Sequence, residues 1–377
     1  MQAAHEPVWY MSDYLNWILI LLFSVQAIYW ILFLIGIHNK KQQPSTSSLP
    51  PLSIIVCAHD EEQNLRELIP LLLAQNHPDF EVIIVDDRSN DGTWDLLLSE
   101  TQKHPRLRMV KVTLKPGHIP GKKFALTLGI KAAQHEIVLL THADCRPEST
   151  SWASEMARRF SPETDIVIGI SPYQKEPGWL NVLIRFEALL TAVFYTSFTR
   201  LGVPYMGVGR NLAYRKKIFF EGKGFNTHLS TVGGDDDLFV NQHARPSNTV
   251  VVLEKDSLMH SLPARSFQSF FTQKIRHLAA GKMYRPVHRL LLAPLMVSQA
   301  TFIPLFLVCV FSSHFQLALV LGLFRWLLIL FTFHGFVKKT GVAFSLLLIP
   351  MADIIFSFYY LGAAPAALVS RKIVWKT

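Results

Sequence analysis

Apolar positions form long runs at both ends of the chain and short, separated runs in its middle. The segment Leu15–Ile37 is almost wholly apolar and carries no charge. At about 1.5 Å rise per residue it is long enough to cross a hydrocarbon core of about 30 Å. Three further segments of membrane length follow Arg289, namely Leu290–Phe311, Gln316–Phe336 and Val342–Val369. The pattern therefore predicts a membrane protein with a water-soluble region between its apolar ends.

Charges and helix breakers beside the apolar segments predict their orientation. The basic stretch 38–41 follows the first segment, so the positive-inside rule places this end in the cytoplasm and the N-terminus outside. If all three C-terminal segments span, the basic tail Arg371–Lys376 lies outside, against that rule. Alternatively, Pro350 and Pro365 break the last segment into a re-entrant or interfacial piece. Arg325 lies inside an apolar run, and we expect it to face protein or a headgroup rather than lipid.

Short apolar strands alternate with amphipathic helices between residues 52 and 286. Strands are predicted at 53–57, 81–85, 107–112 and 136–140, and helices at 64–73, 93–101 and 122–134. This alternation predicts an α/β domain with a mostly parallel sheet and helices on both faces. The resulting division is an anchor (1–41), a Pro/Ser/Thr linker (42–51), the soluble domain (52–286) and a C-terminal membrane region (287–377).

Composition supports the membrane segments and narrows the choice of partners. Half of the 377 residues are hydrophobic, and the mean hydropathy is +0.25, which is high for a soluble enzyme. The formal charge of +9 suits nucleic acid, anionic headgroups or phosphorylated substrates. No nucleic-acid module and no stripe of basic and aromatic residues occurs in the sequence. The membrane and a phosphorylated substrate are therefore the expected partners, and nucleic acid is not.

Acidic residues gather in four clusters that follow one another in the soluble region. They are Asp60-Glu61-Glu62, Asp86-Asp87, the single Asp144 and Asp235-Asp236-Asp237. The first three come directly after predicted strands, and ligands of such sheets bind beyond the carboxyl ends of the strands. We therefore expect these carboxylates to meet around one phosphate-bearing, metal-bound ligand.

Structural roles compete with this interpretation at each cluster. Asp60 with Gln63 resembles a capping box, and turn chemistry accounts for residues 90–92 but not for Asp86-Asp87. The dipole at a helix N-terminus accounts for one or two of residues 235–237. Three adjacent carboxylates nevertheless repel one another, which favours a general base or a metal there. At Asp144, Mg²⁺ is suitable because it commonly takes only one or two carboxylates plus substrate phosphate.

Two basic elements accompany these carboxylates. Gly121-Lys122-Lys123 opens a predicted helix, and a positive helix end with an ammonium suits a diphosphate. A solvated basic pair is the equal alternative. Gln273 and Arg276 stand three residues apart, on one helix face, where they can grip a diphosphate or an acceptor.

Taken in order, the motifs of residues 51–286 resemble those of the family-2 glycosyltransferases, which have a GT-A nucleotide-diphospho-sugar fold. The flanking apolar segments resemble the membrane branch, with its ceramide glucosyltransferase-like enzymes and polysaccharide synthases. The resemblance implies a GT-A domain plus transmembrane helices, and Mg²⁺ or Mn²⁺ as cofactor. It also implies inverting transfer from a nucleotide-diphospho-sugar, UDP-linked by expectation, to a lipid or lipid-linked saccharide. The expected location is a bacterial inner (plasma) membrane, with the catalytic domain cytoplasmic.

The resemblance implies roles for the donor half of the site. Asp60, Glu61 and Asp87 would hold the nucleoside, Asp87 being the second acid of the Val-Asp-Asp turn. Asp144 matches the last residue of the family's D-x-D motif and would ligate the metal. Lys122 is a candidate ligand of the donor diphosphate on the separate ground of its position at a helix start.

The resemblance also implies roles for the catalytic and acceptor half. Asp235 looks like the general base, because it stands two residues before Asp237-Leu238 as in the family's E-D-x-D-L. Asp236 is the alternative base. The segment 207–216 resembles the family's G-x-G-x-N-x-A-Y-R-K acceptor-side segment, which places Gly209 and Asn211 on the acceptor side. Asp237, in the acidic motif, is expected on the same side.

Two positions depart from the family's pattern. His142 stands where the D-x-D motif has its first Asp. The contact to the sugar or ribose at this position, and the affinity for the metal, are therefore expected to differ from those of the family. His277 stands where Q-x-x-R-W has Trp, so an apolar platform is missing while Gln273 and Arg276 still close over diphosphate and acceptor. The second departure favours one-step transfer over the alternative of a processive polysaccharide synthase. Both together motivate a further alternative, a non-catalytic membrane protein that only binds a nucleotide sugar.

Overall fold

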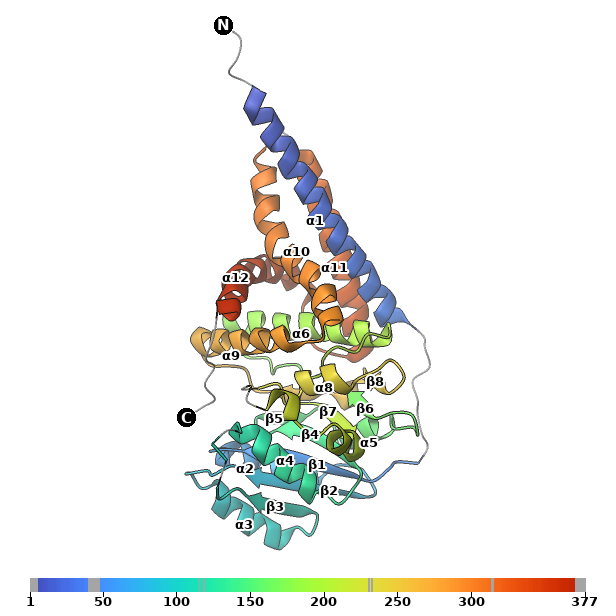
Figure 1. Ribbon diagram of the computed structural model, residues 1–377, viewed down its shortest axis with the longest axis vertical. Coiled ribbons are helices and arrows are strands. Elements are labelled where there is room, and N and C mark those ends of the chain that lie inside the picture. Colours follow the sequence, from blue (N-terminus) through green and yellow to red (C-terminus); the bar gives the residue numbers. More distant parts are fainter. Residues whose placement is uncertain are drawn as a thin grey trace.

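The computed structural model describes residues 6–39, 48–114, 116–117, 119–229, 231, 233–312 and 315–369. It consists of an α/β domain joined to a bundle of long helices, with the first helix leading away from the sheet (Figure 1). Most of the predicted linker and the whole basic tail, residues 42–47 and 370–377, lie outside the described residues. The topology argument drawn from that tail therefore stays a prediction.

The central sheet has seven strands in the order β3-β2-β1-β4-β7-β6-β8. The first four of these run parallel, as predicted, and β7 is antiparallel to both β4 and β6. The three strands beyond β4 were not predicted from the sequence. The bounds are β1 Leu52–Ala58, β2 Phe80–Asp86, β3 Leu107–Lys111, β4 Ile137–His142, β6 Ile166–Ile168, β7 Leu212–Arg215 and β8 Thr249–Val251.

Helices cover both faces of this sheet because its central strands are apolar on both sides. In β1, Ile54 and Val56 face the cluster that includes α2, whereas Ile55 faces the cluster that includes α4. Such runs are typical of parallel strands buried on two faces. The helices of the α/β part are α2 Glu62–Leu73, α3 Thr93–Lys103, α4 Gly121–Ala132, α5 Trp152–Ala157, α7 Lys216–Glu221 and α8 Asp237–His243.

A small second sheet positions the chain after β4. Its strands, β5 (Cys145–Pro147) and β9 (Met259–Ser261), pair antiparallel. Just beyond them, Leu262 donates its backbone N–H to the carbonyl of Asp144 at 3.0 Å. The carboxyl end of β4 is therefore fixed against the segment that leads into α9.

Five helical segments among the described residues are long and apolar enough to cross a membrane. Four of them were predicted, and α6 is the fifth. Figure 1 shows α6 and α9 lying crosswise beneath α1, α10 and α11. The bounds are α1 Glu6–His38, α6 Trp179–Arg200, α9 Phe267–Ala280, α10 Pro286–Val310, α11 Phe315–Thr340 and α12 Ile349–Val369.

The predicted break in the last apolar segment is not present. Helix α12 continues through Pro365 without interruption, and Pro350 lies at its start, where proline is tolerated. Helix α12 also runs crosswise, beside α9 and α6, instead of alongside α1 (Figure 1). The prediction for Arg325 is confirmed: it is 1% exposed and its guanidinium pairs with Asp353 of α12.

Candidate active site

One cleft of about 1100 Å³ opens at the carboxyl ends of the parallel strands. Residues from segments far apart in the chain converge on it, as the sequence predicted. The predicted residues that line it are Glu61, Asp87, Lys122, Asp144, Asp235, Asp236, Asp237, Gln273 and Arg276. Asp60, Gly209 and Asn211 are not among its lining residues. The shared-cleft prediction is therefore confirmed for the first group, and the other three act elsewhere.

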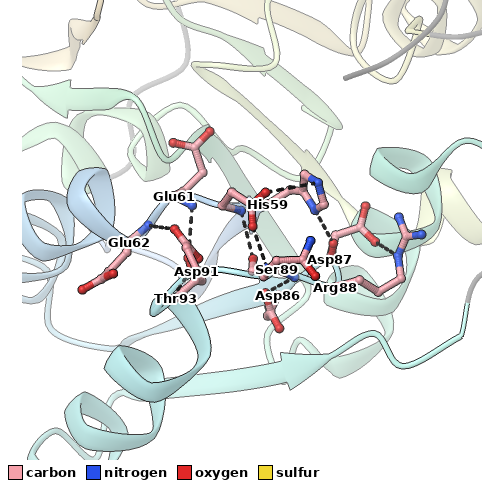
Figure 2. A network of polar contacts seen from close by, with 11 residues as sticks. His59, Glu61, Glu62, Asp86, Asp87, Arg88, Ser89, Asp91 and Thr93 are labelled. Carbon is pink, nitrogen blue, oxygen red and sulfur yellow. Dashed lines mark hydrogen bonds and ion pairs between the residues drawn. The ribbon is translucent and has the colours of Figure 1, made fainter. Parts of the chain in front are cut away.

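Asp60 fastens two turns together instead of capping α2. Its backbone has a positive φ of 55°, its N–H donates to Ser89 Oγ at 3.0 Å, and its Oδ1 accepts from the Asn90 N–H at 2.6 Å. The N-cap residue Glu61 and the first residue of α2, Glu62, are held from the neighbouring turn. Their backbone N–H groups donate to the side chains of Thr93 and Asp91 (Figure 2). The alternative of a capping box at Asp60 is therefore wrong, because side chains from the β2–α3 turn satisfy these donors.

The two acids at the end of β2 have different tasks. Asp86 is fully buried and its Oδ1 accepts from the Ser89 N–H at 3.2 Å, which stabilises the turn. Asp87 lines the cleft, and its Oδ1 accepts from Arg88 Nε at 2.8 Å (Figure 2). A Cβ at Gly121 would lie 2.5 Å from Asp87 Oδ2. Glycine at the first position of α4 is therefore required for this close approach.

Lys122 occupies the centre of the cleft and joins two of its functional groups. Its Nζ lies 2.6 Å from Asp235 Oδ2 and 3.0 Å from His142 Nε2. Burial alone would raise the pKa of Asp235, but the charge and hydrogen bond of Lys122 hold it below its usual range. Burial and the same ammonium hold the pKa of His142 well below its usual range. This contact among three residues was not predicted from the sequence, where Lys122 was expected only as a diphosphate ligand.

Asp144 is the carboxylate best placed to hold a cation. Its side chain is 39% exposed and faces the cleft, with Ser261 Oγ donating to Oδ2 at 3.5 Å. The neutral His142 accepts from Lys122 through Nε2, so its proton is on Nδ1, 4.0 Å from Asp144 Oδ1. No group of three His, Cys, Asp or Glu side chains suited to a metal occurs in the described ranges. The residues present therefore fit Mg²⁺ or Mn²⁺ that takes its other ligands from a diphosphate and water.

The three adjacent carboxylates at the start of α8 are held apart by different partners. Asp236 is the N-cap, and its two oxygens accept from the N–H groups of Asp237 at 2.8 Å and Gly209 at 2.7 Å. Asp237 accepts from Tyr284 Oη at 2.9 Å, while burial and the neighbouring Asp236 raise its pKa. Both oxygens of Asp236 are thus engaged by backbone donors. Asp235 instead pairs with the ammonium group of Lys122.

The two predicted acceptor-side residues of the segment 207–216 have structural tasks. Asn211 is fully buried, and its amide bonds Trp152 Nε1 and the carbonyls of Ile170 and Ser257. The placement of Asn211 on the acceptor side is corrected accordingly, because its hydrogen-bonding capacity is used inside the core. Gly209 acts through its N–H, which holds Asp236.

Helix α9 forms the wall of the cleft on the side of the long helices. Gln273, Arg276 and His277 all line it, as the spacing of the first two predicted. Ser266 caps the helix by accepting from the Ser269 N–H at 3.2 Å. His277 is solvent-exposed in this wall. Arg210 and Tyr173 line the same cleft and were not predicted from the sequence as site residues.

Comparisons with known proteins agree with this architecture. Residues 53–221 match the family model described as Glycosyl transferase family 2. Probable glycosyltransferase YdaM of Bacillus subtilis is 26% identical over 242 residues, which cover 62% of this chain and 54% of that protein. Poly-beta-1,6-N-acetyl-D-glucosamine synthase of Staphylococcus epidermidis is 27% identical over 127 residues, which cover 31% of this chain and 30% of that protein. The chain thus spans about half or less of the length of these two relatives.

A solved structure shares the fold over almost the whole chain. It is the mannosyltransferase PcManGT from Pyrobaculum calidifontis, in complex with GDP-Man and Mn²⁺. Its TM-score is 0.58 at 19% sequence identity, and the match covers 95% of this chain and 100% of that one. This likeness shows the fold and confirms the class expected from the sequence, a GT-A domain accompanied by long apolar helices.

Proposed function

Since this chain carries a glycosyltransferase family 2 domain in residues 53–221, we propose that it is a membrane-bound, inverting glycosyltransferase. It moves a sugar from a nucleotide-diphospho-sugar to a hydroxyl group of a lipid or lipid-linked saccharide. The observation that carries the proposal is the single cleft shared by Asp87, Asp144 and Asp235. That cleft is walled by α9, which packs against candidate membrane-spanning helices. The proposed location is the cytoplasmic side of a bacterial inner (plasma) membrane.

The donor would lie along the carboxyl ends of the strands. Glu61 and Asp87 are placed to accept hydrogen bonds from the nucleoside. The diphosphate would meet Lys122 and the first turn of α4, since the N-terminal end of a helix favours anions. Mg²⁺ or Mn²⁺ held by Asp144 would neutralise the charge that develops on the leaving diphosphate.

The general base would be Asp235. It takes the proton of the acceptor hydroxyl while that oxygen attacks the anomeric carbon from the face opposite the diphosphate. A single displacement of this kind inverts the configuration. In the structure Lys122 neutralises Asp235, so a diphosphate that draws the ammonium away would leave Asp235 more basic. Donor binding would thus prepare the base for the acceptor.

The related proteins support parts of the proposal. PcManGT is in complex with GDP-Man and Mn²⁺, which supports a nucleotide sugar and a divalent cation here. The UDP-linked donor rests on the resemblance of the sequence motifs. The similarity to a polysaccharide synthase favours the processive alternative, whereas His277 in place of an indole favours one-step transfer. Binding without catalysis is the alternative from another class.

Replacement of Asp235 by Asn tests the proposal. We expect transfer from radiolabelled nucleotide sugars to membrane lipid extracts to fall about 10²- to 10⁴-fold. Calorimetric binding of nucleoside diphosphate with Mn²⁺ should persist, because Asp144 and the nucleoside contacts remain. Asp79→Asn, at a side chain that is 65% exposed, is the matched control. Near-full turnover by D235N would refute the assignment of the base, and donor binding without any metal-dependent turnover in the wild type would favour the binding-only alternative.

A further inference from the structure

A second cavity of about 500 Å³ extends from the cleft toward the long helices. It lies between α6, α9, α10 and α12, and it shares Arg210, Asp237, Gln273 and His277 with the cleft. A molecule that reaches Asp235 from the membrane side can therefore continue into this cavity. Asp87, Lys122 and Asp144, which belong to the proposed donor site, do not line it.

Aromatic and aliphatic side chains make up much of the wall of this cavity. They include Phe194 and Tyr195 of α6, Phe270 of α9, and Phe356 and Tyr360 of α12. Side chains of this kind favour an apolar occupant. The four helices around the cavity are apolar or amphipathic. An apolar chain could therefore enter the cavity while the rest of the molecule stays in a membrane.

Positive charge exceeds negative charge around the same cavity. Lys274 pairs with Glu187 inside it, and Asp237 accepts from Tyr284. Lys282 and Arg289 also line it. Apart from the Lys274–Glu187 pair, the charged residues that line the cavity are Arg210, Lys282, Arg289 and Asp237. Burial raises the pKa of Asp237 and so favours its neutral form.

Arg210 stands where the cleft and the cavity meet. Its guanidinium lies over the ring of Tyr173, 4.4 Å from the ring centroid. Its Nη1 is buried and has no hydrogen-bond partner. A buried N–H group without a hydrogen bond is unfavourable. The planar guanidinium group can donate two parallel hydrogen bonds to phosphate oxygens. The junction thus offers an anion site at the entrance of an apolar cavity.

We propose that the acceptor, whose hydroxyl group meets Asp235, is a lipid with an apolar chain and a phosphate. The chain lies in the cavity between α6, α9, α10 and α12, and the phosphate lies on Arg210. This inference rests on the proposed transferase function and names the acceptor class of that site. Arg210 would then be a specificity-determining residue that places the acceptor beside Asp235. The donor diphosphate is the other phosphate that can reach Arg210, and the experiment separates the two.

Binding measurements without donor test the proposal on the full chain in detergent. The probes are tetradecyl phosphate, tetradecanol and inorganic phosphate. We expect the alkyl phosphate to bind at least about tenfold more tightly than either other probe, and Arg210→Met to weaken it about 10- to 100-fold, as expected for lost charge-assisted hydrogen bonds. The affinity of Arg210→Lys for the alkyl phosphate should lie between those of the wild type and R210M, because lysine keeps the charge but cannot donate two parallel hydrogen bonds. Arg66→Met, at a side chain 54% exposed, is the matched control.

A second variant tests the cavity, and donor binding checks that each variant is folded. Ala293 lines the cavity, so Ala293→Trp should exclude the alkyl chain. Both A293W and R210M should bind nucleoside diphosphate with Mn²⁺ as the wild type does. Equal binding of tetradecanol and tetradecyl phosphate, or unchanged alkyl phosphate affinity in R210M, would overturn the proposal. Weakened nucleoside diphosphate binding in R210M would assign Arg210 to the donor. Failure of the wild type to bind nucleoside diphosphate would instead count against the transferase function itself.

Discussion

Replacement of Asp353 by Leu should strongly destabilise the helical bundle, and more so than replacement of its partner Arg325 by Met. Asp353 accepts from Arg325 Nη1 at 2.5 Å and Nη2 at 3.0 Å, from Gln299 Nε2 at 2.7 Å and from Trp326 Nε1 at 3.1 Å. Arg325 Nε donates in turn to Gln26 at 2.5 Å. One carboxylate thereby joins α10, α11 and α12, and the arginine adds α1.

The expected magnitude follows from what each variant leaves behind. D353L leaves a guanidinium that is 1% exposed, and removing one partner of a buried ion pair costs about 3–5 kcal/mol. R325M should cost less, about 1–3 kcal/mol, because the remaining carboxylate keeps its hydrogen bonds from Gln299 and Trp326. The double variant should cost less than D353L alone, since replacing both charges by apolar groups is often close to neutral.

Unfolding of the detergent-solubilised protein, followed by circular dichroism, measures these differences in the free energy of unfolding. The double-mutant cycle gives the coupling energy between the two side chains. The exposed pair of Lys103 and Glu100 is the matched control, and its cycle should give less than about 1 kcal/mol. Equal costs for D353L and R325M, or a double variant that costs the sum of both, would refute the reasoning.

Three further predictions concern the cleft. Lys122→Met should weaken nucleoside diphosphate binding about 10- to 100-fold. The acidic limb of the variant's pH–rate profile should move to higher pH, because Asp235 loses the charge that lowers its pKa. An acidic limb at the wild-type pH would contradict the pairing of Lys122 with Asp235. The pKa of Asp237 is raised, so its stabilising contribution is present below the unfolded pKa and is lost as pH rises through the folded value, and Asp237→Asn should flatten the fall of Tm toward alkaline pH. Chelation should abolish transfer and added Mn²⁺ or Mg²⁺ should restore it, whereas Asp144→Asn should resist rescue at the same metal concentration.

The part of the fold that could be predicted is the part written in long periodic segments. The four parallel strands and three helices of residues 52–142 were predicted within a few residues, because buried runs and amphipathic stretches are strong signals. Strands β6, β7 and β8 have only three or four residues, and their pairing depends on contacts distant in sequence. Helix α6 was missed because Arg185, Glu187 and Arg200 interrupt its apolar pattern, although the protein itself covers most of its surface.

The candidate site could be predicted to the level of convergence but not of contacts. Acids placed after strands must meet at one edge of a parallel sheet, which is why Asp87 and Asp144 were found. The hydrogen-bond partners of each carboxylate oxygen depend on the conformation of loops, which have no periodic sequence pattern from which it could be predicted. Asn211 matched a motif yet bonds inside the core, and Arg210 beside it drew no attention, although it alone of the two lines the cleft.

The histidine at position 142 is understandable once Lys122 is placed beside it. A carboxylate at that position would lie near the ammonium, where His142 Nε2 is at 3.0 Å, and would compete with Asp235 for the same positive charge. The neutral imidazole accepts one hydrogen bond and adds no charge, so Asp235 keeps Lys122 as its ion-pair partner. The departure from the D-x-D motif therefore removes a possible metal ligand and in exchange makes the lysine a dedicated partner of the proposed base. A diphosphate that binds at the start of α4 and pairs with Lys122 would therefore remove the ion-pair partner of Asp235.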